Sequence, residues 1–518
     1  MNRMPSLHAD ARAHATSRPH GSAEPSTIAR HEWLMLVLVV VACRWLASPI
    51  FPTYDDAFIT YRYAQNLADG RGLVFNPGEP WEPVLGTTTP LYALLLAGLA
   101  RLGADLVTAS LLVNALLDAI TAACLPRLFG RARAASIGAL LAFAVLPPLV
   151  RIGAGGMESP LFLACGVGAA VAAASDRRVL AGTLAAATCL VRPEGVLLCA
   201  VMFVSQCRGP RERRTRDLVR FTLPIVIVGA VAIAWLVHVY GTPIPQSVTA
   251  KSTMRQGDWL QESIVRWKTI LSQAFWPNAF LLPFLPLVAF GAWRALKSGG
   301  PLRVVSSWAL AITGSYLAAR PHTWGWYFYV PLAAWALWCG GGAGELVARL
   351  APRVSPRVRE FVSRAIVPAA CTAIVAAAWY AGRAYPTPVR ERVYEPMARW
   401  AESTSAQEPR SRILASDIGA IGWHWRGTVL DSEGLVWPAA LTYGSPMAIV
   451  EHEKPEYLML VAERFRVRQF RAREDLRAAY EPILRFSAGG RTSLDPTPEE
   501  CEIYWTQDYL IFRRRDAR

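Results

Sequence analysis

The segment from residue 208 to residue 240 decides the class of fold, and it reads RGPRERRTRDLVRFTLPIVIVGAVAIAWLVHVY. Its first part, 208–220, is rich in arginine, and the part from 219 to 240 is almost wholly apolar. An apolar run of about 20 residues can cross the hydrocarbon core of a bilayer as a helix. Basic residues that flank such a run mark its cytoplasmic end. The segment therefore predicts a transmembrane helix that begins in the cytoplasm.

Similar apolar runs recur along the chain, which has 518 residues, of which 53% are hydrophobic and only 18% are charged. We expect about eleven membrane spans on the criterion of length and apolarity: 33–50, 106–126, 134–150, 157–174, 179–191, 195–207, 219–240, 277–296, 303–319, 327–348 and 365–382. The short runs 179–191 and 195–207 are separated by Arg192-Pro193-Glu194-Gly195. They predict a helical hairpin with a polar tip, which is tolerated where protein or a water-filled cavity surrounds it.

The loops between these runs are alternately rich and poor in arginine. The basic loops are 127–133, 177–178, 208–220, 294–303 and 349–364, whereas the other short loops hold single basic residues, Arg151, Arg192 and Arg320. The positive-inside rule places the basic loops in the cytoplasm, with the N-terminus inside and the C-terminus outside. This threading requires 89–101 to be a juxtamembrane helix on the outer face. The net charge of +15 therefore reflects topology, and no nucleic-acid partner is predicted.

Three regions follow from the pattern. Residues 1–30 are polar and are expected to form a disordered cytoplasmic tail. Residues 31–382 form an all-α polytopic membrane domain, whose first outer loop is 51–105. Residues 383–518 are ordinary globular sequence with short strands expected at 413–415, 428–430 and 457–461, which predicts a small extracytoplasmic α/β domain. The nine cysteines lie mostly in apolar runs without zinc-ligand spacing and are interpreted as packing residues.

The first outer loop contains adjacent carboxylates, Asp55 and Asp56, just after the first span. Because neighbouring carboxylates repel, the pKa of one of them rises unless a cation or hydrogen bonds intervene. Such a group suits a base that accepts a proton from a hydroxyl. The alternative is that the pair caps the helix predicted by the residues that follow.

The order of several motifs resembles that of a known enzyme superfamily. The run from Asp55 to Ala64, followed by Gly70 to Glu79, resembles the first outer loop of the GT-C superfamily of polyprenyl-phosphate-sugar-dependent glycosyltransferases. The segments 156–160, 190–195, 240–246 with Lys251, and 417–422 follow in the family's order, so the resemblance covers nearly the whole chain after residue 50. The sequence is most similar to the arabinofuranosyltransferase-like branch. Protein O-mannosyltransferases and lipid A aminoarabinose transferases are more distant.

The resemblance implies a function and a location. An inverting glycosyltransferase of the bacterial plasma (inner) membrane would take a sugar from a polyprenyl phosphate. It would transfer the sugar to a hydroxyl of a cell-envelope glycan, lipid or protein on the outer side. The family's catalytic base maps onto Asp55, and Asp56 is a second catalytic candidate that could orient Asp55, bind the acceptor or hold a metal. No cofactor is required by the sequence, and a divalent metal stays open.

Further residues are candidates for substrate binding. Arg192 and Lys251 are expected to hold the donor phosphate, because guanidinium and ammonium groups both bind phosphate. The alternatives are an ion pair of Arg192 with Glu158 or Glu194, and interfacial snorkelling of Lys251. The donor site also includes Glu194, Arg320, His322 and Tyr327, although aromatic residues before the tenth span could instead form an interfacial belt. Arg62 and Glu82 could contact the donor or the acceptor and are expected to bind the acceptor, although the alternative for Glu82 is a solvated surface residue.

Polar residues inside the spans, namely Asn114, Asp118 and His238, are expected to form interhelical hydrogen bonds. Two rival functions remain. A transporter or flippase of lipid-linked sugars would explain the many spans, but it predicts matching halves, and the 51–86 pattern occurs once. A protein that binds lipid-linked glycans without turnover is the other rival.

Overall fold

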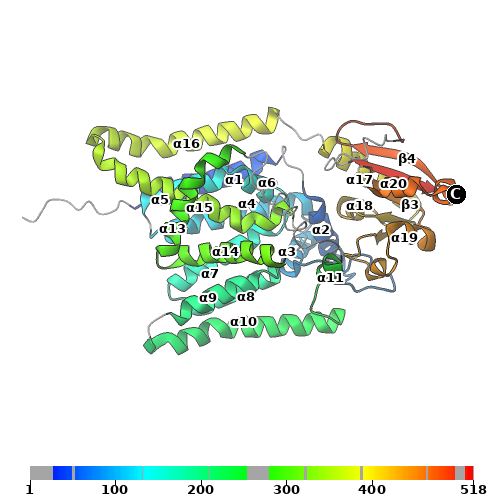
Figure 1. Ribbon diagram of the computed structural model, residues 1–518, viewed down its shortest axis with the longest axis horizontal. Helices are drawn as coiled ribbons and strands as arrows, with labels where there is room; N and C mark the ends of the chain where they lie inside the picture. The colour runs from blue at the N-terminus through cyan, green and yellow to red at the C-terminus, as the bar shows by residue number, and fades with distance from the viewer. Residues whose placement is uncertain are drawn as a thin grey trace, which may run out of the picture.

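The structure is a computed structural model that describes residues 27–48, 53–130, 132–208, 211–253, 279–319, 324–384, 389–462, 465–495 and 508–516. Long helices that run roughly side by side form a bundle, and a smaller domain with a sheet lies at one end of it (Figure 1). We call this smaller part, whose described residues begin at 389, the outer domain, after its predicted location. Most of the predicted tail 1–30 lies outside the described residues.

The bundle contains helices on all of the predicted spans. They are α1 (Arg30–Ala47), α4 (Leu106–Leu128), α5 (Arg133–Val145), α6 (Pro147–Gly153), α7 (Ser159–Ala174), α8 (Arg178–Val191), α9 (Gly195–Cys207), α10 (Arg211–Tyr240), α13 (Leu285–Lys297), α14 (Pro301–Ala319), α15 (Tyr329–Leu350) and α16 (Pro356–Ala384). By length and composition α4 and α10 can each cross a membrane, and α5 with α6, bent by 61°, makes a third if the pair is one span. The count of eleven spans therefore stays a prediction.

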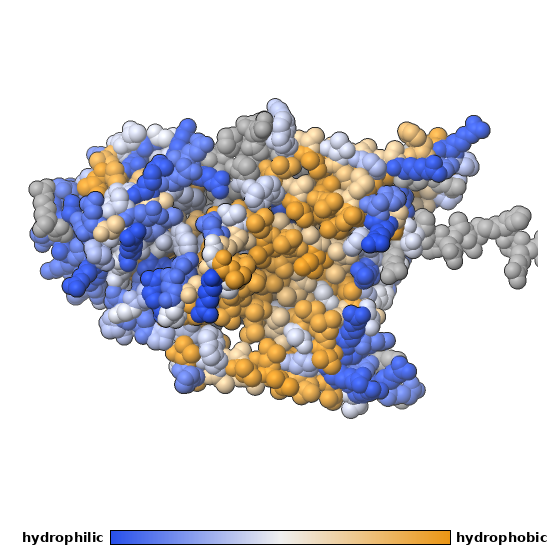
Figure 2. All heavy atoms as spheres, turned by 180° about the vertical axis from the view of Figure 1, so that it is seen from behind, coloured by the Kyte–Doolittle hydropathy of each residue, from blue (hydrophilic) through white to orange (hydrophobic). Residues whose placement is uncertain are grey.

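The surface of the bundle is apolar around its middle. Figure 2 shows hydrophobic side chains gathered between the hydrophilic outer domain and a hydrophilic patch at the opposite end. On α10 the exposed side chains include Val226, Ile227, Val231 and Ile233. Apolar patches of this extent on a protein surface mark contact with a membrane or another partner. This band is consistent with a helix bundle surrounded by lipid.

The basic loops meet at the end of the bundle that faces away from the outer domain. Arg133 pairs with Glu32 and so joins the starts of α5 and α1. The Nε of Arg178 lies 3.5 Å from the Asp217 carboxylate, which joins the starts of α8 and α10. The arginine-rich start of α10 lies far from the outer domain (Figure 1). The structure thus gathers on one end the loops that the charge pattern assigns to the cytoplasm.

Single-cysteine labelling tests which side of the membrane each end occupies. In a variant without native cysteines, Glu474→Cys in the outer domain should react with a membrane-impermeant maleimide in intact spheroplasts. Thr215→Cys in the basic loop should react only after the membrane is opened, because positive loops stay in the cytoplasm. Labelling of residue 215 but not of residue 474 in intact cells would reverse the orientation.

The outer domain contains a mixed sheet with the strand order β2-β1-β3-β5-β4. Its strands are β1 (Arg412–Ala415), β2 (Thr428–Asp431), β3 (Tyr457–Val461), β4 (Tyr480–Ser487) and β5 (Asp508–Arg514), with helices α17 (Glu395–Gln407), α18 (Gly419–His424), α19 (Pro446–Glu453), α20 (Phe465–Arg471) and α21 (Glu474–Ala479). Strand β1 is parallel to β2 and β3, and β5 is antiparallel to β3 and β4. The three predicted strands are β1, β2 and β3, so the predicted small α/β fold is confirmed.

A buried arginine stabilises the break between α5 and α6. Pro147 and Pro148 have no N–H, so they cannot donate to the carbonyls of Phe143 and Ala144, four residues earlier. The guanidinium of Arg44 on α1 donates to these same two carbonyls at 3.2 and 3.1 Å. A side chain from another helix therefore satisfies the two backbone acceptors that the prolines leave open.

The charge of Arg44 is balanced within the bundle. Its Nε donates to the Asp118 carboxylate at 2.6 Å, and the hydroxyl of Tyr329 donates to the same carboxylate at 2.6 Å. The side-chain oxygen of Asn114 accepts the hydroxyl of Tyr92, on the helix Pro90–Arg101, at 3.2 Å, and its amide donates to the carbonyl of Met157, before α7, at 2.9 Å. The predicted interhelical bonding of Asp118 and Asn114 is therefore confirmed. The third candidate, at position 238, is exposed on α10 and makes no interhelical hydrogen bond with the described residues.

Candidate active site

The candidate site lies where the bundle meets the outer domain. Three short helices, α2 (Asp55–Ala68), α3 (Pro90–Arg101) and α11 (Gln246–Thr253), lie in this region (Figure 1). We call the group formed by Asp55, Asp56, Arg192, Lys251 and Tyr327 the junction site. The two aspartates are the first residues of α2, but neither carboxylate accepts a hydrogen bond from the described amides of that helix. The alternative that the pair caps its own helix by such bonds is therefore not observed.

Asp55 holds the first turn of α18 instead. One carboxylate oxygen accepts the N–H of Gly419 at 2.9 Å, and the other accepts the N–H of Ala420 at 2.8 Å. The first amides of a helix have no partner within the helix, so a carboxylate there is a favourable acceptor. The side chain thereby links α2 to the outer domain and is fixed in orientation.

The surroundings of Asp55 make it a weaker acid than an ordinary aspartate. Burial, followed by the negative charge of Asp417, raises the pKa of Asp55 to about 7, and the charge of Asp56 acts in the same direction. The N–H groups of Ala420 and Gly419 oppose this rise, because they stabilise the ionised form. A pKa near the working pH suits a general base.

Asp56 has different surroundings. It accepts no hydrogen bond from any residue in the described part of the chain. Burial raises its pKa, the ammonium of Lys251 lowers it, and the carboxylates of Asp417 and Glu158 raise it further. The Asp56 carboxylate therefore interacts electrostatically with Lys251 on α11 and with Glu158 from the bundle.

Lys251 is a partly buried cation that donates a hydrogen bond to a tyrosine hydroxyl. Its Nζ donates to the hydroxyl of Tyr327 at 3.0 Å, and it forms no ion pair within 4.0 Å with a described carboxylate. Burial lowers the pKa of Lys251, but the hydroxyl of Tyr327 and the charge of Asp56 outweigh burial and raise it. The ammonium is therefore charged, and it keeps N–H donors for an anionic ligand.

Arg192 is already paired with carboxylates. It lies between α8 and α9, and its guanidinium contacts Glu158 at 2.5 Å and Glu194 at 3.0 Å. The guanidinium also lies over the ring of Tyr327, 4.4 Å from the ring centroid. Glu194 additionally accepts the hydroxyl of Tyr316 at 2.6 Å. The ion-pair alternative for Arg192 is thus observed with both carboxylates, and its role in donor binding stays a prediction.

Arg62 is saturated by backbone carbonyls. Its guanidinium donates to the carbonyls of Gly422, Trp425 at 2.9 Å, Gly427 at 3.2 Å and Phe75 at 2.6 Å. These bonds join α2 to the C-terminal end of α18 and to the segment after it. The expected acceptor contact of Arg62 has no support in this arrangement and stays an untested prediction.

Glu82 likewise stabilises its own loop. Its carboxylate accepts the N–H of Asn76 at 2.8 Å, of Val84 at 2.6 Å and of Phe75 at 3.2 Å. All of these donors lie in the first outer loop. The geometry therefore favours a structural role for Glu82, and its acceptor contact also stays a prediction.

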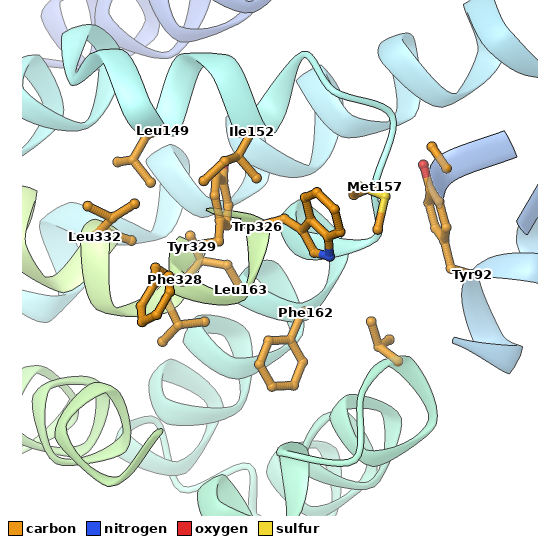
Figure 3. Close-up of a cluster of buried hydrophobic side chains, with 14 of the residues drawn as sticks. Tyr92, Leu149, Ile152, Met157, Phe162, Leu163, Trp326, Phe328, Tyr329 and Leu332 are labelled. Carbon is orange, nitrogen blue, oxygen red and sulfur yellow. The ribbon is translucent and has the colours of Figure 1, made fainter. Parts of the chain in front are cut away.

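Two predicted donor-site residues, Arg320 and His322, lie outside the described residues. Tyr327, by contrast, contacts both cations of the junction site, as the preceding distances show. Its neighbour Trp326 packs against Tyr54 with ring centroids 4.8 Å apart. Figure 3 shows Trp326 among apolar side chains that include Met157 and Phe162. Aromatic and apolar side chains therefore lie beside the charged groups.

Sequence reasoning did not assign roles to two charged residues near the aspartates. Asp417 follows β1 and accepts the hydroxyl of Tyr509 at 3.0 Å. Arg151 on α6 lies 6.0 Å from the ring centroid of Tyr54, the residue before Asp55. The signal for Asp417 was its place in the 417–422 motif. The signal for Arg151 was its position as the only basic residue of its loop.

The described residues contain no cluster of His, Cys, Asp or Glu side chains suited to a metal ion. A cavity of about 510 Å³ lies between α1 and α16, lined by apolar side chains such as Met35, Val375 and Trp379. A second cavity of about 430 Å³ lies in the outer domain between α19, α21 and the end of β5. Neither cavity includes a residue of the junction site.

The chain is similar to known proteins in part of its sequence and in its fold. Residues 383–507 match a domain family of unknown function, DUF8728, and no curated protein matches the sequence. Among solved structures, the chain is similar to ArnT from Cupriavidus metallidurans bound to undecaprenyl phosphate, with a TM-score of 0.53 and 12% sequence identity. The match covers 93% of this chain and 98% of ArnT. The chain therefore shares the fold of ArnT, which supports the predicted GT-C type of fold, while membership of the superfamily and of its arabinofuranosyltransferase-like branch stays a prediction.

Proposed function

We propose that this chain is an inverting glycosyltransferase that moves a sugar from a polyprenyl phosphate to an acceptor hydroxyl outside the plasma membrane. The observation that carries the proposal is the junction site, where Asp55 is fixed by two amides and has a pKa of about 7. The next residue, Asp56, interacts electrostatically with the partly buried Lys251, which forms no ion pair within 4.0 Å with a described carboxylate. The fold shared with ArnT, which was crystallised with undecaprenyl phosphate, supports a lipid-phosphate donor.

The chemistry would be a single displacement. Asp55 accepts the proton of the acceptor hydroxyl as its oxygen attacks the anomeric carbon of the sugar. The bond between that carbon and the phosphate oxygen breaks, so the polyprenyl phosphate leaves with an additional negative charge. In this scheme Lys251 stabilises that charge, which grows in the transition state. One displacement at the anomeric carbon inverts its configuration.

The other residues have supporting tasks in this scheme. Asp56 balances the charge of Lys251 before the donor enters and then is available to an acceptor hydroxyl. Arg192, neutralised by Glu158 and Glu194, holds the ring of Tyr327, whose hydroxyl fixes Lys251. The geometry therefore favours Lys251 as the primary phosphate ligand and gives Arg192 an indirect part.

Donor binding tests the phosphate site. Lys251→Ala should weaken binding of a polyprenyl phosphate by roughly tenfold to a hundredfold, because one charge-assisted contact contributes on the order of 1.5–3 kcal/mol. Native mass spectrometry of the detergent-purified protein with added lipid measures the bound fraction directly. Lys251→Arg, which keeps a positive charge, should lose less.

A matched control is Lys454→Ala, because Lys454 lies at the cavity of the outer domain and should not affect the lipid. If Lys251→Ala binds the polyprenyl phosphate with native affinity, Lys251 is not the phosphate ligand. Absence of polyprenyl phosphate binding in the unaltered protein would contradict the proposed donor class. It would leave a function unrelated to lipid-linked sugars.

A further inference from the structure

Helix α2 holds α18 at both of its ends. At the first turn of α18, Asp55 accepts two amide hydrogens at 2.8 and 2.9 Å. At the other end, the guanidinium of Arg62 donates to the carbonyls of Gly422 and Trp425. A carboxylate thus meets the unpaired amides and a guanidinium meets the unpaired carbonyls, as the charge distribution of a helix favours.

This arrangement links the proposed catalytic residue to the outer domain. Helix α2 lies between α1 and α4 of the bundle along the chain, whereas α18 lies within the region 383–507. The Asp55 carboxylate is therefore itself a contact between the two parts. A change in how α18 sits against α2 moves the carboxylate that the proposed reaction uses.

We propose that α18 positions Asp55 for the reaction, so that Gly419 is a positioning residue and the outer domain is part of the catalytic unit. This inference rests on the proposed function for its catalytic meaning. The contact between Asp55 and α18 is a property of the fold alone. The two can therefore be tested separately.

The contact depends on a glycine at position 419. A Cβ atom at Gly419 would lie 1.8 Å from the backbone oxygen of Asp55 and 2.7 Å from one of its carboxylate oxygens. The nearer atom belongs to the backbone, so a rotation of a side chain cannot relieve the clash. Any larger residue at 419 must separate α18 from α2.

The charged and titratable groups that act on Asp55 come from several elements. Asp56 is on its own helix, Asp417 follows β1, and Tyr509 lies on β5. On the bundle side, Arg151 lies against Tyr54, the residue before Asp55. Lys251 and Glu158 act on Asp56.

Two substitutions in the same turn should have opposite effects on the pH profile. Loss of the two amide donors removes groups that stabilise the ionised carboxylate, so Gly419→Ala should move the acidic limb of kcat/KM to higher pH. Asp417→Asn removes a negative charge that disfavours ionisation, so it should move that limb to lower pH. A merely structural weakening of the domain does not produce shifts of opposite sign.

The Gly419→Ala substitution should also lower kcat. A displacement of about 1 Å at a reacting group can lower a rate on the order of a hundredfold, so Gly419→Ala should reduce kcat about tenfold to a hundredfold with the donor KM unchanged. Gly489→Ala is the matched control in the outer domain, because a Cβ there meets only Ser487, at 3.7 Å. Asp417→Asn is nearly isosteric, so it keeps the test open if Gly419→Ala does not fold.

Amide hydrogen exchange tests the contact without any activity assay. In the full-length protein, exchange of a peptide that covers 416–425 should become faster in Asp55→Ala than in the unaltered chain. Unchanged exchange, or a native kcat and pH profile in both Gly419→Ala and Asp417→Asn, would overturn the positioning proposal. If the unaltered protein transfers no sugar while the exchange effect is present, the proposed function fails and the contact stands.

Discussion

Asp55→Asn is expected to lower the rate of sugar transfer by about 10²–10⁴-fold, the usual range for loss of a general base. The amide is nearly isosteric with the carboxylate but cannot accept a proton from the acceptor hydroxyl. The asparagine also carries only one oxygen, whereas both oxygens of Asp55 accept amide hydrogens from α18. Some weakening of the contact with α18 should therefore accompany the loss of rate.

Rates and donor binding must be measured on the same preparation in detergent or nanodiscs. Donor affinity should stay native, because the phosphate ligand Lys251 is untouched. Asp56→Asn is the neighbouring control and should lower the rate less, since Asp56 accepts no hydrogen bond from a described residue. Near-native transfer by Asp55→Asn would contradict the mechanism, whereas equal losses in both variants would move the base assignment to the pair.

In the unaltered enzyme, the dependence of kcat/KM on pH should reflect the ionisation of Asp55. Because the pKa of Asp55 is raised to about 7, the carboxyl is protonated below that pH and cannot act as a base. The value of kcat/KM should therefore fall about tenfold for each pH unit below 7 and level off above it. The acidic limb should be absent from the residual activity of Asp55→Asn.

The helices and strands were largely predictable because each depends on a local pattern. The apolar run 219–240 falls within α10, and the strand prediction at 457–461 coincides with β3. The number of membrane crossings was harder to establish, because helices such as α8 and α9 are short and whether a short helix spans depends on its neighbours. A hydropathy pattern describes one segment and carries no information about those neighbours.

For the candidate site, the sequence indicated which residues lie together better than it indicated what each of them contacts. The aspartate pair and Lys251 are in one place, and the alternative ion pairs of Arg192 were named from the sequence. The partners of Asp55 and Arg62 were not predictable, because they lie 364 and 360 positions away along the chain. The same charges would suit substrate contacts or domain contacts, and only the fold distinguishes these possibilities.

Removal of a buried charge within the bundle should have a large effect on stability. Arg44→Met is expected to lower the free energy of unfolding by about 3–5 kcal/mol, as found when one partner of a buried ion pair is removed. The substitution leaves the Asp118 carboxylate, which is fully buried, without its cation. It also removes the donors that serve the carbonyls of Phe143 and Ala144, which the following prolines cannot serve.

A double-mutant cycle separates these two costs. Asp118→Leu in the Arg44→Met background removes the uncompensated charge, so the double variant should unfold at higher temperature than Arg44→Met alone. It should still be less stable than the unaltered protein, because two buried carbonyls lack donors, at about 1–3 kcal/mol for each.

Thermal unfolding in detergent at constant lipid content measures each step. Arg349→Ala, which breaks a half-exposed pair with Glu345, is the control and should cost less than about 1 kcal/mol. If Arg44→Met unfolds at the same temperature as the unaltered protein, the carbonyls at the break between α5 and α6 have another source of donors. Recovery of full stability in the double variant would show that the ion pair alone, and not the proline-disrupted backbone, makes Arg44 necessary.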